Sequence, residues 1–309
     1  MPQSPSPKSL ALACCIGLAT TAATAQPSAS TAGGSPWRIS LDAGAVHRFD
    51  AALSSDGDFE RDTYLLRFSA TRQWSPALRA GLSLSYEQDD YSFDLAADRT
   101  AAAPWGTIRT LGLSLPLRYR ASDRWSVFAI PRLRYAAEED ASLGDGREAG
   151  LLAGAAYRLS DRLSIGPGLG VFSEIGSGTD VFPILLVDWK ISDTLSLETG
   201  RGLAASRGPG VTLRWTPPGS WSFGLAARYE KRRFRLDDTG EAPDGIGQDK
   251  AVPIALTAAY TPNERVKISL LAGAEFAGNL RLETAQGRKI SSTDYDPAAF
   301  AGAVVSVTF

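Results

Sequence analysis

The chain has 309 residues, of which 44% are hydrophobic, and its 32 basic and 34 acidic side chains leave a formal net charge of −2. No stretch of the chain after its N-terminal leader holds the ~18 consecutive apolar residues of a membrane-spanning helix, which excludes a helical membrane protein. The only cysteines, Cys14 and Cys15, lie close to the N-terminus.

The N-terminal segment has the pattern of a secretory signal peptide. Residues 1–25 carry Lys8 and no acidic residue, continue with the apolar run 10–18, and end on an A-T-A sequence that suits cleavage. Both cysteines would leave with this segment, so the mature chain would have no disulfide, thiol nucleophile or cysteine metal ligand. Residues 26–36, rich in Ser, Ala, Gly and Pro, are interpreted as a flexible linker, and residues 37–309 as the folded part.

Short polar turns recur at intervals in the folded part. Examples are W-S-P-A-L at 74–78, A-S-D-R-W at 121–125, L-S-D-R-L at 159–163 and I-S-D-T-L at 191–195. Ser, Asp and Pro favour turns because they bend the backbone or bond to it locally. Two more such turns follow at 216–221 and 261–266, and a longer connection separates each turn from the next. The repeat is a hairpin followed by a loop.

This repeat predicts fourteen antiparallel strands, with twelve or sixteen as the alternatives if a hairpin is miscounted. Six short turns and seven longer loops place both ends of the folded part on the short-turn side. The predicted strands are 37–49, 61–74, 77–88, 106–121, 124–137, 148–160, 162–174, 180–191, 194–203, 209–216, 220–235, 250–261, 264–280 and 298–309.

The strands alternate between an apolar face and a face of small and polar residues. In 111–119, four leucines and Tyr119 oppose Gly, Ser, Pro and Arg, and the runs 78–86 and 221–229 repeat the pattern. A period of two puts the apolar residues on one side of a sheet. The polar faces mix small residues with arginine, as the lumen of a membrane barrel would, whereas the outer face of a soluble sandwich would be charged.

Aromatic residues gather near the short turns. Rings of this amphipathic kind suit the headgroup region of a membrane and are typical of an aromatic girdle. Tyr64, Tyr86, Tyr229 and Phe276 would mark the opposite rim. The predicted girdle comprises Trp37, Trp74, Trp125, Trp189, Trp215, Trp221, Tyr119, Tyr157 and Tyr260.

The last strand ends on an aromatic residue that follows alternating apolar positions, with Val305, Val307 and Phe309 on one face. This segment resembles the closing strand of Gram-negative outer-membrane β-barrels, and the hairpin pattern and the girdle extend the resemblance over the whole mature chain. The resemblance implies an all-β, up-and-down antiparallel barrel that is exported through the Sec pathway. It also implies periplasmic chaperones and a barrel-assembly machinery that recognises this C-terminal signal.

Charge is divided between loops and strands. The segments 50–62, 87–103, 138–148 and 237–250 together carry 20 acidic and 4 basic residues, which leaves the rest of the mature chain with a positive excess. Strand parity points eight arginines toward the lumen. They are Arg67, Arg79, Arg118, Arg132, Arg134, Arg158, Arg214 and Arg228.

Two interpretations of these arginines stay open. They could favour anions in a pore, since guanidinium groups bind carboxylates and phosphates. Alternatively, they could pair with inward acids such as Asp42 and Glu275 and brace a filled barrel. The acidic loops could be solvated surface, or they could hold divalent cations that bridge to lipopolysaccharide. No other cofactor and no resident metal is expected.

The sequence offers little for catalysis. His47 is the only histidine, and no serine motif accompanies it, so an enzyme is not expected. The glycine clusters at 166–170 and 207–210 have no helix after them and are not phosphate loops. The basic stretch 230–235 continues a strand and is followed by two aspartates, which argues against nucleic acid as a partner.

These patterns favour a passive channel for small solutes with a weak anion preference, in the outer membrane of a Gram-negative bacterium. The protein would be a monomer surrounded by outer-membrane lipids and lipopolysaccharide. A non-conducting structural or surface-binding barrel that acts through its acidic loops is the alternative. A lipid-modifying outer-membrane enzyme is a third and more remote one.

Overall fold

A computed structural model describes the chain apart from residues 1–36, 96–102, 177 and 200–209. The predicted signal peptide and linker therefore lie outside the described residues, as do parts of the predicted strands near 200–209. In the described part of the chain there is no helix of the length and apolarity needed to cross a membrane.

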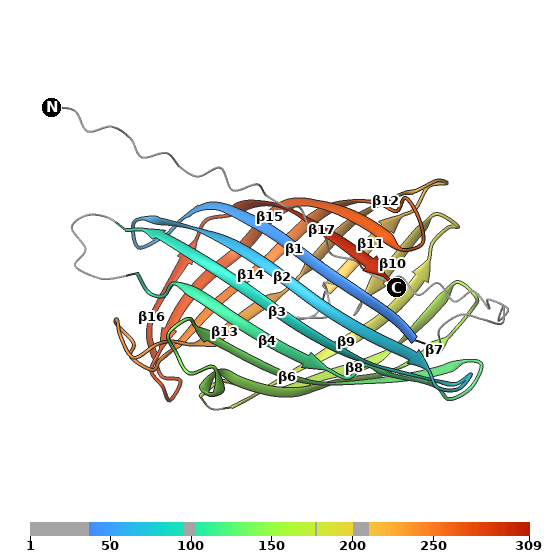
Figure 1. Ribbon diagram of the computed structural model, residues 1–309, viewed down its shortest axis with the longest axis horizontal. Coiled ribbons are helices and arrows are strands. Elements are labelled where there is room, and N and C mark those ends of the chain that lie inside the picture. The colour runs from blue at the N-terminus through green and yellow to red at the C-terminus, as the bar shows by residue number, and fades with distance from the viewer. Residues whose placement is uncertain (1–36, 96–102, 177, 200–209) are drawn as a thin grey trace.

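Seventeen strand segments form a single sheet that closes on itself (Figure 1). They are β1 Trp37–Ala52, β2 Asp58–Gln73, β3 Leu78–Asp94, β4 Thr107–Ser114, β5 Leu117–Arg120, β6 Trp125–Glu138, β7 Arg147–Arg158, β8 Leu163–Ser173, β9 Thr179–Lys190, β10 Leu195–Thr199, β11 Gly210–Trp215, β12 Trp221–Arg228, β13 Glu230–Arg235, β14 Ile246–Tyr260, β15 Val266–Glu283, β16 Lys289–Tyr295 and β17 Ala298–Thr308. A short 3-10 helix, η1 Leu143–Gly146, precedes β7.

Fourteen wall strands result, because three of them are each divided into two segments. β4 and β5 are separated at Pro116, β12 and β13 at Tyr229, and β16 and β17 at Pro297. Proline has no amide hydrogen to donate to a ladder, which explains the first and third interruptions. The antiparallel pairing of β1 with β17, from Ser40↔Thr308 to Arg48↔Phe300, closes the barrel.

The predicted fold and strand count are therefore confirmed, and with them the architectural resemblance to outer-membrane β-barrels. Strand ends differ from the prediction by a few residues in most cases. The last wall strand is the exception, since it begins nine residues earlier, at Lys289, as β16. Asp296 and Pro297 divide it, and this break hid its first half in the sequence pattern.

The short turns are built in the same way in four hairpins. Ser75, Ser122, Ser160 and Ser192 each accept a hydrogen bond from the backbone amide three residues later, at 3.0 to 3.1 Å. Asn263 does the same for Val266 at 2.9 Å. Because a side-chain oxygen satisfies an amide that the ladder leaves free, the repeated serines fix the hairpin geometry.

The outer face of the wall is apolar. Leu256 is 64% exposed and Leu185 62%, and Leu270, Val181, Leu84 and Leu225 are also exposed. On the last strand Ala299 and Ala301 face outward, whereas Val304 and Ser306 are buried inside. An exposed apolar band of this kind is typical of a barrel whose outer face contacts lipid.

The aromatic residues of the predicted girdle lie at the short-turn end, at the right of Figure 1. Their rings pack in pairs, with centroids 6.0 Å apart for Trp37 and Trp74 and 5.0 Å apart for Trp125 and Tyr157. At the other end Tyr64, Tyr229 and Phe276 are each exposed by at least 40%. The exposed apolar band lies between these two rings of aromatic side chains.

A substitution on this band gives a direct test of which face contacts lipid. Leu256→Arg is expected to destabilise the folded barrel by ~2–4 kcal/mol, since a guanidinium would enter the hydrocarbon layer. Thr257→Arg, at the next position and facing inward, is expected to be milder. Urea-dependent folding into lipid vesicles measures both variants, and equal losses would show that the faces are wrongly assigned.

Candidate functional site

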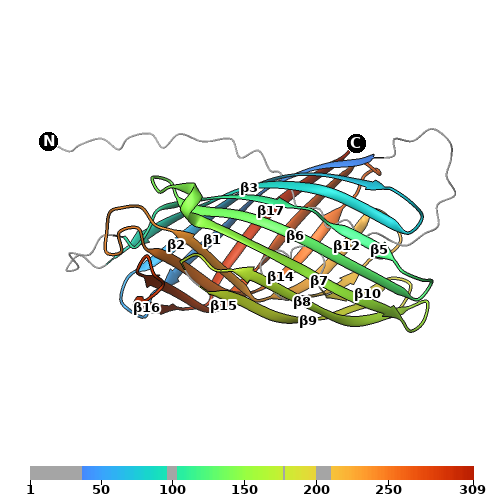
Figure 2. The same ribbon diagram turned by 90° about the horizontal axis from the view of Figure 1, so that it is seen from below.

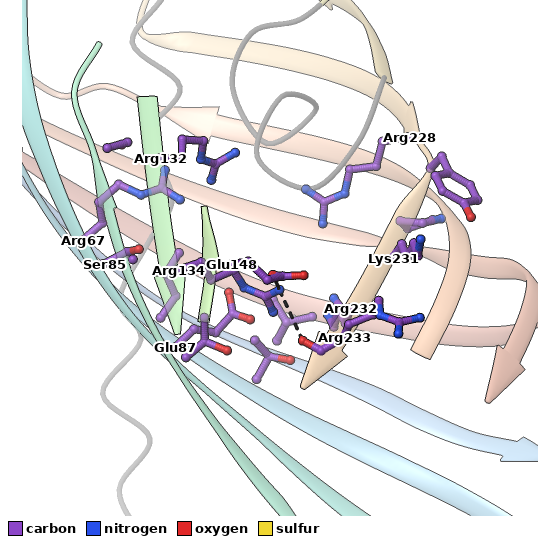
Figure 3. Close-up of a pocket in the computed structure, with 18 of the residues that line it drawn as sticks. Arg67, Ser85, Glu87, Arg132, Arg134, Glu148, Arg228, Lys231, Arg232 and Arg233 are labelled. Carbon is purple, nitrogen blue, oxygen red and sulfur yellow. Dashed lines mark hydrogen bonds and ion pairs between the residues drawn. The ribbon is translucent and has the colours of Figure 1, made fainter. Parts of the chain in front are cut away.

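The interior holds a cavity of about 450 Å³, which we call the central cavity. Its wall includes Arg67 from β2, Arg132 and Arg134 from β6, and Arg228 from β12 (Figure 3). Small residues such as Ser85, on the neighbouring strand β3, separate these arginines. The cavity exists because short side chains stand between long basic ones.

The hydrogen-bond ladder places the basic residues in two rows. Arg67 lies opposite Ser85, Ser85 opposite Gly112, and Gly112 opposite Arg134. In the adjacent row, Ser114 lies opposite Arg132. Neighbouring strands are ~4.8 Å apart, so the guanidinium groups can reach over the small residues into shared space.

Some of the cavity arginines are paired. Arg134 donates to Glu148 at 2.6 Å, and Lys231 is bonded to Glu174 and lies 3.3 Å from Asp180. Arg132 lies within electrostatic range of Arg67 and Arg134, so like charges gather on this wall. Among the described residues, the main opposing charge near Arg67 is Asp42.

The structure separates the eight predicted arginines into two groups. Arg67, Arg132, Arg134 and Arg228 line the central cavity. The other four lie closer to the short turns, where Arg79 is exposed and donates a hydrogen bond to the side-chain oxygen of Gln73 at 3.0 Å. Arg118 and Arg158 are also exposed, and Arg214 is half-buried on β11.

Toward the long-loop end, the cavity is bordered by an ion cluster. It consists of four arginines and four carboxylates that are close enough to pair. They are Arg48, Arg61, Arg228, Arg232, Asp89, Asp249, Glu230 and Glu275.

Asp249 and Arg61 are central to this cluster. Asp249 is fully buried and pairs with Arg61, and it accepts hydrogen bonds from the hydroxyls of Tyr91 at 2.9 Å and Tyr295 at 3.0 Å. Arg61 also donates to Glu275 at 2.7 Å. Burial, followed by the charge of Asp249, raises the pKa of both tyrosine hydroxyls, which keeps them protonated as donors.

An apolar cluster, here called the aromatic cap, lies on the ion cluster at the long-loop end, on the side formed by β1–β6 and β13–β17. It contains Phe59, Tyr91, Phe93, Trp105, Phe234 and Tyr295. Trp105 is 3% exposed, and its ring centroid lies 5.1 Å from that of Phe234 and 5.7 Å from that of Tyr91. Phe59 stacks on the guanidinium of Arg48 at 3.7 Å.

β13 makes this packing possible because it stays paired with β14 and also reaches β6. Arg235 at its end pairs in parallel with Ala137 of β6, a strand on another side of the barrel. Arg232, Arg233 and Phe234 are all buried, so the alternation seen in β12 ends after Tyr229. At the long-loop end β6 is therefore a direct neighbour of β13, and strands β7–β11 are bypassed, so the barrel is narrower there than in its middle. The coil of η1, which follows β6, lies at this end in Figure 2.

Glu138 fastens loops to this narrow end. Its carboxylate accepts backbone amides from Gly106 at 2.7 Å and Asp237 at 3.2 Å, which joins the connections after β3 and β13. Burial raises the pKa of the Glu138 carboxyl, and the two amide bonds oppose that change.

The cap and the ion cluster contain residues that the sequence assigned elsewhere. Asp89 and Asp249 were placed in acidic loops, yet they are 3% and 0% exposed. The basic stretch 230–235 continues a strand as predicted, paired with β14, but Arg232 and Arg233 on it are buried. A signal was present, since Lys231, Arg233 and Arg235 stand at positions where the alternation of this strand would place outward-facing apolar residues.

The structure also places His47 and Phe309, which the sequence singled out. His47 lies on the outer rim, where its Nδ1 is 2.8 Å from Asp62 and its ring packs on Phe49. No group of three or more potential metal ligands occurs within the described ranges. Phe309 is exposed at the short-turn end, and its amide donates to the carbonyl of Ile39 at 2.8 Å.

Comparisons with known proteins give structural neighbours only. An outer-membrane channel from Pseudomonas putida F1 shares 14% identity over 93% of this chain and 100% of its own, with a TM-score of 0.49. A FadL homologue from Pseudomonas aeruginosa shares 11% over 88% of this chain and 89% of its own, also at 0.49. The KdgM porin, solved with disordered oligogalacturonate, shares 10% over 87% and 99%, at 0.38. No protein-family model and no curated protein matches the chain.

Proposed function

We propose that this protein is a channel of the Gram-negative outer membrane that admits small anionic solutes. The observation that carries the proposal is the central cavity, where Arg67, Arg132 and Arg228 face one shared space inside a closed barrel. Guanidinium groups in a confined space lower the barrier for anions and bind carboxylates in bidentate fashion. The apolar band on the outer face supports a membrane location.

Passage through such a barrel leads past the long-loop end, where described residues narrow the path on the side of β6 and β13. The aromatic cap and the ion cluster occupy that end, and β13 holds it closed through its contact with β6. We therefore propose that the channel is gated, with the cap and β13 as the moving part. Packed clusters of this kind have two discrete arrangements more readily than a continuous range of them.

A non-conducting barrel is the second candidate, and the cap is the observation that favours it. If the cap never opens, the inward arginines serve to brace the interior together with acids such as Glu148 and Glu275. The external segments would then act as a binding surface, with divalent cations bridging acidic side chains to lipopolysaccharide.

The proposal also includes a route of export and assembly. We expect Sec-dependent export, handling by periplasmic chaperones, and insertion by the assembly machinery through the signal formed by Phe309, Val307 and Val305. The protein would act as a monomer in contact with outer-membrane lipids. We propose that the protein transports solutes and does not catalyse a reaction, and that it uses no cofactor and binds no nucleic acid.

Planar-bilayer recording in a salt gradient separates the two candidates. A channel of the proposed kind gives single-channel currents whose reversal potential indicates anion preference. Arg67→Gln is expected to shift that potential toward the cation side, because it removes one cavity charge. Arg79→Gln, which neutralises an exposed arginine near the short turns, is the matched control and is expected to shift it less. Absence of current over the whole voltage range would favour the non-conducting barrel, and cation preference would refute the role of the arginines.

A further inference from the structure

One side of the central cavity is aromatic. Phe172 of β8 and Phe182 of β9 line it, with ring centroids 6.0 Å apart and ring planes within 3° of parallel. Each ring lies over a glycine of the neighbouring strand, Phe172 over Gly150 and Phe182 over Gly170, where a Cβ would collide with it. The glycines therefore allow both rings to lie flat along the wall.

The aromatic side adjoins the basic side in the same ladder row. Arg132 lies opposite Gly150, and Gly150 lies opposite Phe172. Two strand spacings separate Arg132 from Phe172, which is ~10 Å between backbones. Because Gly150 has no side chain, nothing from β7 stands between the guanidinium and the ring at this position.

The remaining lining completes a compact site. Leu152 of β7 is 5% exposed and faces the cavity beside the rings. Ser85 and Ser114 leave open space next to Arg67 and Arg132. A volume of about 450 Å³ lies in the usual range for small-molecule sites. Toward the long-loop end, Arg61 and Glu275 of the ion cluster border the cavity and limit the length of a bound molecule.

We infer that the central cavity binds a compact aromatic carboxylate, whose carboxylate meets Arg67 and Arg132 and whose ring packs on Phe172 and Phe182. Arginine binds carboxylates in bidentate fashion, and parallel rings present their faces for offset stacking. An inorganic anion would contact only the basic side of the cavity, and a neutral arene only the aromatic side. The inference deepens the proposed channel function by naming its solute class.

Calorimetric titration of the detergent-solubilised full-length chain tests the inference with three probes. Benzoate carries both the charge and the ring, benzamide has the same ring without the charge, and acetate has the charge without the ring. Benzoate is expected to bind. Benzamide is expected to bind at least about tenfold more weakly because it loses the charge-assisted contact with the arginines, and acetate at least about tenfold more weakly because it has no ring to bury against Phe172 and Phe182. Equal binding of benzoate and benzamide, or no binding of benzoate by the folded wild-type protein, would overturn the inference.

Variants assign the two halves of the site. Arg67→Gln is expected to weaken benzoate binding by about tenfold or more, whereas Arg79→Gln leaves it unchanged. Phe182→Leu is expected to weaken benzoate about two- to tenfold and to leave acetate unchanged, as loss of one ring–ring contact predicts. Circular dichroism confirms that each variant is folded. Unchanged benzoate affinity in both Arg67→Gln and Phe182→Leu would contradict the assignment.

The binding assay and the conductance recording test the two proposals separately, so that either proposal can fail while the other holds. A barrel that binds benzoate but passes no current would refute the channel and retain the site. A barrel that conducts anions but does not distinguish benzoate from benzamide would refute the aromatic carboxylate and retain the channel.

Discussion

Replacing Asp249 with alanine is expected to destabilise the folded barrel by ~3–5 kcal/mol, because it leaves buried arginines with too few carboxylates. Asp249 is 0% exposed and pairs with Arg61, and Arg232 lies 3.7 Å away. It also accepts the hydroxyls of Tyr91 and Tyr295, which would lose their partner. Urea-dependent unfolding from lipid vesicles measures the loss.

The chain offers a matched control for this substitution. Asp193, in the turn after β9, pairs at 2.8 Å with Arg162, in the turn after β7, but their side chains are 91% and 58% exposed. Asp193→Ala is expected to change stability by less than ~1 kcal/mol, since water screens an exposed pair. If the two aspartates had similar effects, the ion cluster would not contribute to the stability of the closed end.

Removing the indole of Trp105 is expected to have the largest effect on the closure itself. Trp105 packs edge to face on Tyr91, Phe93 and Phe234 and is almost completely buried. Trp105→Ala leaves a cavity in the aromatic cap and is expected to cost ~3–5 kcal/mol in unfolding free energy. In planar bilayers the same variant should open more often than the wild type, because the cap no longer fills the mouth.

Trp125→Ala provides the comparison at the opposite end. Trp125 is 45% exposed at the short-turn end and packs on Tyr157. Its removal is expected to leave channel opening unchanged, since no part of the cap depends on it. If both tryptophan variants changed opening equally, general loosening of the barrel would explain the result better than loss of the cap.

The barrel could be predicted from the sequence because its determinants are local. A serine such as Ser122 marks a hairpin turn through a bond to an amide three residues away. The period of two in runs such as 221–229 places the apolar face toward lipid without reference to any other strand. Repetition of these local signals was sufficient for the fourteen wall strands, whose count the structure confirms.

The closed end could not be predicted in the same way, since its contacts are distant in sequence. Arg61 and Asp249 are 188 positions apart, and Arg61 and Glu275 are 214 apart. Parity says that such residues face inward, but it does not say which of them meet. The contact of β13 with β6 depends on the pairing of Arg235 with Ala137, for which only the charged residues at outward positions of the alternation gave a local sign.

The sequence pattern also could not tell which inward arginines lie in the central cavity. Parity gave an inward direction to Arg67 and Arg79 alike, because it carries no information on height within the barrel. The structure places Arg67 in the central cavity and Arg79 in an exposed position near the short turns. The aromatic side of the cavity was missed because Phe172 and Phe182 interrupt the small and polar pattern expected for an inward face.

Accessibility of the central cavity from the cell exterior tests the central claim, a basic cavity closed by the aromatic cap, most directly. Ser114 lines the cavity, and Cys14 and Cys15 are the only other positions with cysteine in the full chain. Ser114→Cys can therefore be labelled in intact cells with an anionic, membrane-impermeant thiol reagent. Slow labelling behind an intact cap, and much faster labelling when Trp105→Ala is added, is the predicted result. Labelling that is equally fast with and without Trp105 would contradict the closure.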